Sequence, residues 1–238
     1  MPVPRARPML CKNRLLNALP VEELHRLECF LNPATLRPRQ IMHGAGQSTN
    51  QVHFIEEGLV SVLADTGEER PIEVWLIGCE GLVGLPAVLG GFRPPFRRIA
   101  LMHAHALHID ADDLKRAMQD SLPLTRLLLR YVQSNLIHAS QAAACNTRHT
   151  VKERVLRWLL LAHDRMPGDQ IPLTHALLAR LLGVRRATVT DCLGMLERDG
   201  CIRQGRGTIV VIDRARLEQA ACNCYRIIAL AYENCRQL

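Results

Sequence analysis

Two adjacent arginines, Arg185 and Arg186, are the side chains in this sequence best suited to bind a partner through directed hydrogen bonds. A guanidinium group carries paired N–H donors, which match phosphate oxygens or the O6 and N7 atoms of guanine. Thr190 and Asp191 follow about one helical turn later, so that all four side chains can lie on one side of a helix. The pattern predicts a polar recognition surface.

The residues around this pair have the spacing of a helix-turn-helix. Thr174 suits the N-cap of a first helix, Ala179 is small where two helices cross, Gly183 suits a left-handed turn, and Val189 faces the first helix. The alternative is an ordinary pair of core helices. We expect the DNA-binding residues to be Thr174 in the first helix and Arg185, Arg186, Ala187, Thr188, Thr190 and Asp191 in the second.

A hairpin is predicted directly after this motif. Residues Cys201–Arg203 and Thr208–Ile212 have the composition of its strands, and Arg206 lies between two glycines at its tip, where it could reach a phosphate. From Arg148 to Arg216 the chain has 13 Lys or Arg against 7 Asp or Glu, within a net charge of +7. A local basic surplus favours a polyanionic partner over a merely solvated basic face once a motif is present.

The elements that must position this motif lie upstream. Many short apolar stretches separated by turn residues from Pro33 to Ile109 predict an antiparallel barrel, jelly roll or sandwich. The period then becomes helical, and two apolar stripes run along one long helix. The first stripe contains Leu124, Leu128, Tyr131, Asn135 and His138, and the second contains Leu129, Val132, Leu136, Ala139 and Ala143.

Two stripes predict two packing partners for this helix, the protein's own β-rich domain and a second subunit. The alternative is a plain core helix in a monomer. Because a polar residue in a helical seam can fix the register of an oligomer, Asn135 and His138 favour the dimer.

The segment from Gly183 to Leu196, followed by Glu197–Ile202 and Gly207–Val211, resembles the DNA-binding domain of the Crp/Fnr family. The segment Glu80-Gly81-Leu82-Val83-Gly84 also resembles the family's turn into the effector cassette. The resemblance implies an α+β fold: an N-terminal antiparallel β-roll like a cyclic-nucleotide-binding domain, a long dimerisation helix and a C-terminal winged helix-turn-helix. The expected parts are a sensor domain at 9–120, the dimerisation helix at 121–146, the DNA-binding domain at 147–216 and a terminal helix at 217–238.

The resemblance further implies a homodimeric transcription regulator that binds palindromic double-stranded DNA, with RNA polymerase as a further partner. Arg186 matches the family's guanine-reading arginine. Ala187 stands where a glutamate is usual, and Asp191 where an arginine is common, so we expect a different operator. Asp191 could accept from cytosine N4, or it could face away from DNA.

The effector pocket departs from the cyclic-nucleotide pattern. Leu85, after Gly84, stands in place of the ribose-binding glutamate, and Arg98-Ile99 in place of the Arg-Ser pair that binds the cyclic phosphate. A ribose hydroxyl facing Leu85 would be unpaired at a cost of ~1–3 kcal/mol, so cAMP is not expected. Arg97 and Arg98 could bind another anion, although exposed strand-end charges are the more ordinary interpretation.

The spacing of the cysteines and histidines gives little support for metal binding or redox chemistry. An iron–sulfur cluster needs four suitably placed thiolates, and only Cys11 lies near the N-terminus. His103 and His105 could chelate a metal with His43 or His53, but two ligands on one strand face are not a site. Cys224 and Cys235 both fall on the packed stripe of a predicted terminal helix, where a cysteine acts as a small apolar residue. Of the pair Cys222-x-Cys224, only Cys222 is then a candidate for redox chemistry. We expect no cofactor and no metal, with the effector unknown.

The remaining classes are a sequence-specific regulator, a sensor whose output is DNA binding, and a metal-dependent enzyme of the jelly-roll type. The enzyme lacks a clustered His-x-His with a following carboxylate and leaves the winged helix unexplained, so no catalysis is expected. No apolar run approaches the ~20 residues of a membrane span, and Met1–Leu10 lacks the apolar region of a secretion signal. We therefore expect a cytoplasmic protein with no membrane partner.

Overall fold

The computed structural model describes residues 11–67, 71–91 and 93–237. Residues Met1–Leu10, on which the expectation about a secretion signal depends, lie outside this range. Four short helical segments accompany the N-terminal half of the chain: η1 (Leu16–Ala18), α1 (Val21–Glu28), α2 (Leu85–Val88) and α3 (Ala111–Asp120).

The N-terminal domain is built from two four-stranded antiparallel sheets. The first has the order β1-β8-β3-β6, formed by β1 (Asn32–Leu36), β3 (Gln51–Glu57), β6 (Leu82–Val83) and β8 (Ala104–Asp110). The second has the order β2-β7-β4-β5, formed by β2 (Ile41–His43), β4 (Val60–Ala64), β5 (Ile72–Ile77) and β7 (Arg97–Ala100). Side chains of both sheets, including Val60, Ile77 and Ala106, are buried together in one apolar cluster. The expected β-roll is confirmed.

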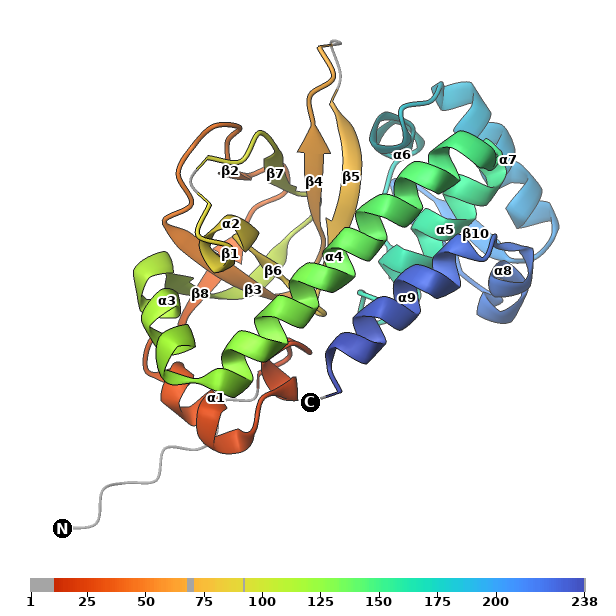
Figure 1. Ribbon diagram of the computed structural model, residues 1–238. Helices are drawn as coiled ribbons and strands as arrows, with labels where there is room; N and C mark the ends of the chain where they lie inside the picture. Colours follow the sequence, from red (N-terminus) through yellow and green to blue (C-terminus); the bar gives the residue numbers. More distant parts are fainter. Residues whose placement is uncertain (1–10, 68–70, 92, 238) are drawn as a thin grey trace.

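A single long helix, α4 (Leu122–Arg148), crosses from the β-roll to the C-terminal domain, and α9 (Cys224–Cys235) runs beside it (Figure 1). The first apolar stripe of α4 is buried inside the protomer. Tyr131 accepts from Leu82 N at 3.1 Å, and His138 Nδ1 lies 3.0 Å from the Tyr232 hydroxyl, which donates to Asn135 Oδ1 at 3.3 Å.

These contacts correct the argument for a dimer from Asn135 and His138. Both polar side chains have partners within their own chain, on α9, and neither faces outward. Leu124 and Leu128 are likewise buried, at 3% and 1% exposure. The stripe expected to serve a partner subunit therefore packs within the protomer.

The C-terminal domain combines four helices with a small sheet. A capping box, in which Thr150 and Glu153 bond each other's backbone N–H, starts α5. The helices are α5 (Val151–His163), α6 (His175–Leu182), α7 (Arg186–Arg198) and α8 (Arg214–Ala220). The sheet has the order β10-β11-β9, formed by β9 (Gln170–Ile171), β10 (Ile202–Gly205) and β11 (Thr208–Val211).

Two polar contacts join the β-roll to this domain. Arg165 Nε donates to Glu80 Oε1 at 2.7 Å, with both side chains almost fully buried. Trp158 Nε1 donates to Glu73 Oε1 at 2.6 Å. Since a buried charged or polar group is costly without a partner, these pairs hold the two domains in a defined relation. Among the described residues, no helix has the length and apolar character that a membrane crossing needs.

Candidate DNA-binding surface

The turn between α6 and α7 has the geometry that the sequence spacing predicts. Gly183 is left-handed, with φ 64° and ψ 40°, and Val184 N donates to Ala179 O at 3.0 Å across the turn. Thr174 caps α6, because its hydroxyl accepts from Leu177 N at 3.2 Å. The chain therefore leaves α6 sharply and enters α7 at a fixed angle.

Helix α7 has one buried face and one open face. Its buried residues are Val189, Cys192, Leu193 and Leu196. Arg186, Ala187, Thr190 and Asp191 are exposed, whereas Thr188 is half-buried. The structure thus brings the predicted recognition residues together on the outer face of one 13-residue helix, with Thr188 at its margin.

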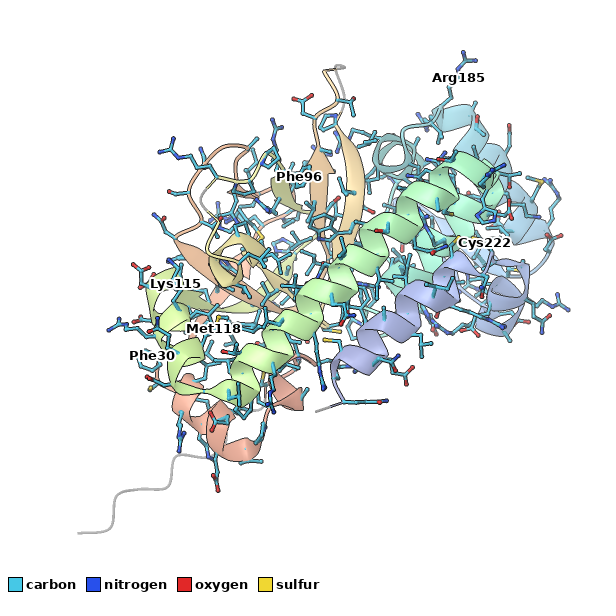
Figure 2. All side chains as sticks on the ribbon, in the orientation of Figure 1. Phe30, Phe96, Lys115, Met118, Arg185 and Cys222 are labelled. Atoms are coloured by element: carbon cyan, nitrogen blue, oxygen red, sulfur yellow. The ribbon has the colours of Figure 1, made fainter. Side chains whose placement is uncertain are left out.

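The two arginines at the start of α7 form no ion pair with a carboxylate of the described residues. Arg185 is the N-cap residue, with extended backbone, and its side chain points away from the molecule (Figure 2). Within the described parts of the chain, no ion pair involves Arg185 or Arg186. Both guanidinium groups are therefore available to an anionic partner.

His175 belongs to the same surface and was missed by sequence reasoning. Its Nδ1 atom lies 3.0 Å from Thr190 Oγ1, which links the first turn of α6 to the open face of α7. Its position in the sequence, directly after the N-cap residue Thr174, could have indicated that it lies near the start of α7. A threonine hydroxyl can both donate and accept, so Thr190 keeps capacity for a further hydrogen bond.

The predicted hairpin is present beside α7. Strands β10 and β11 pair in register from Ile202–Val211 to Gly205–Thr208, so the turn consists of Arg206 and Gly207. Gly207 has φ 74°, and Arg206 is exposed at the tip. Glu197 at the end of α7 accepts from Gln204 N at 2.6 Å and Nε2 at 2.8 Å, which fixes the hairpin against the helix.

The interior of the β-roll differs from the sequence interpretation at one position. Arg98 is only 4% exposed, so it is not a strand-end surface charge, whereas Arg97 is exposed as expected. Arg98 Nη1 donates to Phe96 O at 3.0 Å, and burial lowers the pKa of its guanidinium to about 10. Ile99 is half-buried beside it.

His43 is the cross-strand neighbour of Arg98 and lies beside His53, but His103 and His105 do not belong to this group. His43 and His53 are buried, their ring centroids 6.1 Å apart, and burial lowers the pKa of His53 to about 4. His103 and His105 are exposed and do not join them. The hypothesis that His103 and His105 chelate a metal with this pair is therefore wrong, because they point to solvent.

At the entrance to the predicted effector cassette, Gly84 has φ 125° and Leu85 is the first residue of α2. A Cβ on Gly84 would lie 2.9 Å from Val52 Cγ2, so the position needs glycine for space as well as for conformation. Leu85 is half-buried and packs on the main apolar core. An apolar side chain therefore stands where a ribose hydroxyl would need a hydrogen-bond partner.

The second apolar stripe of α4 is exposed. Leu122, Leu129 and Leu136 are 59%, 49% and 67% accessible and recur every seven residues. Val132 and Ala139, half-buried, lie between them at the other heptad position. A seven-residue apolar repeat is the pattern by which two helices pack together.

An antiparallel β-roll, a long helix and a winged helix-turn-helix with an open recognition helix define a sensor-linked DNA-binding protein. Two family models match the chain in this order: the cyclic nucleotide-binding domain over residues 33–121, and the Crp-like helix-turn-helix domain over residues 153–220. Together they cover more than half of the 238 residues. The chain belongs to the Crp/Fnr family of transcription regulators, which are not enzymes.

Characterised relatives agree with this assignment. The transcriptional regulator SdrP of Thermus thermophilus is 27% identical over 179 residues, which span 72% of this chain and 84% of the relative. The global nitrogen regulator of Synechocystis is 23% identical over 186 residues, which span 73% and 81%. FixK2 from Bradyrhizobium japonicum has the same fold, with a TM-score of 0.70 at 20% identity over 81% of this chain and 98% of that one.

Proposed function

We propose that the protein is a homodimeric transcription regulator that binds a palindromic DNA site with α7 in the major groove and the β10–β11 hairpin on the backbone. The observation that carries this proposal is the open face of α7, where Arg185 and Arg186 have no acidic partner among the described residues. Arg186 would read guanine through O6 and N7, a contact worth ~1–3 kcal/mol of base discrimination. Arg206 would bind phosphate without regard to sequence.

The recognition surface also contains an acidic group. Asp191 is exposed and lies about one turn from Arg186 and Ala187 on α7. In the groove its carboxylate can accept from cytosine N4 but repels phosphate, so we expect it to select bases rather than to add affinity. Because Asp191 is acidic, we expect this protein to prefer an operator different from that of a regulator with a basic residue at the same position of the helix.

The dimer is proposed to form through the exposed heptad stripe of α4. Leu129 and Leu136 would become buried against the same residues of a second copy, as in a two-stranded coiled coil. A two-fold axis along α4 would present two copies of α7 to half-sites ~34 Å apart on one side of the duplex. A regulator of this kind would act in the cytoplasm, and contact with RNA polymerase stays a prediction.

The effector is proposed to be neither cAMP nor an iron–sulfur cluster. Leu85 offers no hydrogen bond to a ribose, and among the described residues neither Cys11 nor Cys29 belongs to a group of metal-ligating side chains. Calorimetry with cAMP should show no heat of binding. Micromolar binding of cAMP would refute the interpretation of Leu85 and Ile99.

The experiment that tests DNA recognition begins by selecting bound fragments from random duplexes. Fluorescence anisotropy then compares the selected operator with a scrambled duplex for the wild type, Arg186→Ala and Arg206→Ala. Arg186→Ala should lower the ratio of specific to non-specific affinity by about tenfold or more per half-site. Arg206→Ala should weaken both duplexes alike and reduce the salt slope by about one.

Arg26→Ala is the matched control, since it removes the same charge from α1, at the far end of the sensor domain from α7 (Figure 1). Its affinity for both duplexes should equal that of the wild type. An unchanged specificity ratio in Arg186→Ala would exclude α7 as the reader. A selection that enriches no sequence would exclude the regulator function as proposed.

A further inference from the structure

Four side chains that can ligate a soft metal gather where the long helix ends. Cys145 lies in the last turn of α4, and His149 is the C-cap residue of that helix. Cys222 lies in the connection from α8, and Cys224 is the first residue of α9. Figure 2 shows Cys222 at the end of α9 that faces the DNA-binding domain. Two chain segments 77 residues apart thus each contribute two donors.

The donor atoms converge on one point. The three Sγ atoms and a ring nitrogen of His149 all lie within 4.8 Å of one another. Cys145 Sγ is 3.8 Å from Cys222 Sγ, and Cys224 Sγ is 3.4 Å from His149 Nδ1. With Zn–S near 2.3 Å and Zn–N near 2.0–2.1 Å, a tetrahedron separates two sulfurs by about 3.8 Å and sulfur from nitrogen by about 3.6 Å. The Cys145–Cys222 and Cys224–His149 separations are close to these values, and every other pair of donor atoms lies within 4.8 Å.

The surroundings complete the arrangement. Cys145 and Cys224 are buried, Cys222 is half-buried as a residue, and His149 is partly exposed, so an ion could enter from the side of His149. Gln141 Nε2 donates to Cys224 Sγ at 3.1 Å. Glu153 Oε1 lies 4.0 Å from Nε2 of His149, on the side of the ring away from the thiols. A hydrogen-bond donor to a thiolate is an outer contact that orients metal ligands, and Glu153 lies within ion-pair distance of the second ring nitrogen of His149.

The geometry points to a Zn²⁺ site formed by Cys145, His149, Cys222 and Cys224. Three thiolates and an imidazole fill a tetrahedral shell, which leaves no open position and makes the site structural rather than catalytic. Packing alone explains buried thiols such as Cys192, but not three thiols and an imidazole that face one another. Cys224, interpreted from the sequence as a packing residue, is one of the ligands.

The position of this site gives it a structural consequence that rests on the proposed function. Arg154 and Arg157 of α5 both donate to Asn146, next to Cys145, so the α4–α5 junction lies directly beside the cluster. A metal bound there clamps the end of the dimerisation helix to α9 and thereby fixes the DNA-binding domain relative to α4. Losing the metal would free this junction and weaken binding to a two-site operator.

The test uses the full chain without a polyhistidine tag, purified in the presence of a thiol reductant. Atomic emission should find about equimolar zinc after dialysis, and Co²⁺ added to the chelator-treated protein should give the absorption of tetrahedral cobalt thiolate. Cys222→Ser and Cys224→Ser should lose stoichiometric zinc. Gln141→Ala should weaken zinc binding about tenfold. Cys29→Ser, an exposed thiol after α1, should retain zinc like the wild type.

Circular dichroism of each variant separates lost ligation from lost folding, and the cobalt titration of the wild type depends on no variant. Reduced wild-type protein that takes up neither Zn²⁺ nor Co²⁺ would overturn the site. Equal zinc in Cys222→Ser, Cys224→Ser and the wild type would overturn the ligand set, as would a Cys145–Cys222 disulfide that forms instead of metal binding.

DNA binding is the second readout. Operator affinity should fall at least tenfold when a chelator removes the metal and should return on adding Zn²⁺. An unchanged affinity would overturn the role of the junction while leaving the metal site intact. If no operator exists at all, the proposed function fails, yet the metal content still decides the site.

Discussion

Glu73 provides the most direct test of how the two domains are joined. Its Oε1 accepts from Trp158 Nε1 of α5, and its Oε2 accepts from Ser61 Oγ of β4, each at 2.6 Å. The side chain is largely buried between the two domains, and this burial raises the pKa of its carboxyl group from 4.5 to about 7. The two hydrogen bonds and the nearby charges of Arg157 and Arg165 favour the ionised form but offset only part of that effect.

The raised pKa sets the sign and size of a pH dependence. Between pH 4.5 and about 7 the folded protein keeps a proton on Glu73 that the unfolded chain releases, so stability falls as pH rises through this window. Below pH 4.5 both states are protonated, and above about 7 both are ionised. At about 1.4 kcal/mol per pH unit, the interval corresponds to about 3 kcal/mol.

Glu73→Gln removes this titration while keeping both hydrogen bonds, because the amide oxygen can accept from Trp158 and the amide nitrogen can donate to Ser61. Urea unfolding followed by circular dichroism at pH 5 and pH 8 should show the variant close to wild type at pH 5 and about 3 kcal/mol more stable at pH 8. Glu22→Gln, exposed in α1, is the control and should keep the wild-type dependence. A Glu73→Gln protein with an unchanged pH slope would refute the reasoning.

Three further predictions follow from single contacts. Gly183→Ala should cost about 1–2 kcal/mol in urea unfolding, because the left-handed turn disfavours a side chain and the new methyl would lie 3.0 Å from a β5 side chain; a neutral change would contradict this. Tyr131→Phe should cost about 1–3 kcal/mol by the same measurement, since both backbone groups of Leu82 lose a buried partner; equal stability would show that the hydroxyl is dispensable. Leu136→Glu should sediment as a monomer at micromolar concentration and bind the operator more weakly, whereas Val21→Glu, equally exposed, should remain dimeric; a dimeric Leu136→Glu would locate the interface elsewhere.

The helix-turn-helix and its wing could be predicted from the sequence because short-range rules govern them. Gly183 must adopt a left-handed turn, and Thr174 caps a helix that begins at the next residue. The hairpin likewise follows from the glycine on either side of Arg206. Each of these features is decided within about ten residues, so spacing alone identifies it.

The two faces of α4 could not be assigned in this way. Both stripes are apolar at heptad spacing. The polar residue Asn135 indicated that its stripe faces a second subunit, but its hydrogen-bond partner Tyr232 lies 97 residues away on α9 of the same chain. The metal-ligand cluster is hidden for the same reason. Cys145 and Cys222 come together only when α9 packs along α4, and Arg98 is buried only because β7 pairs with β2 and β4.

The segment Glu80-Gly81-Leu82 shows how the β-roll could act on the rest of the molecule. Glu80 holds Arg165 of the DNA-binding domain, and Leu82 shares two hydrogen bonds with Tyr131 of α4. Gly81 lies between them directly against the Tyr131 hydroxyl, where a side chain would overlap the ring. Three consecutive residues that lead into β6 therefore contact both the long helix and the C-terminal domain. A change in the β-roll that moves this segment would act on α4 through Tyr131 and on the C-terminal domain through Arg165, because both side chains contact it directly.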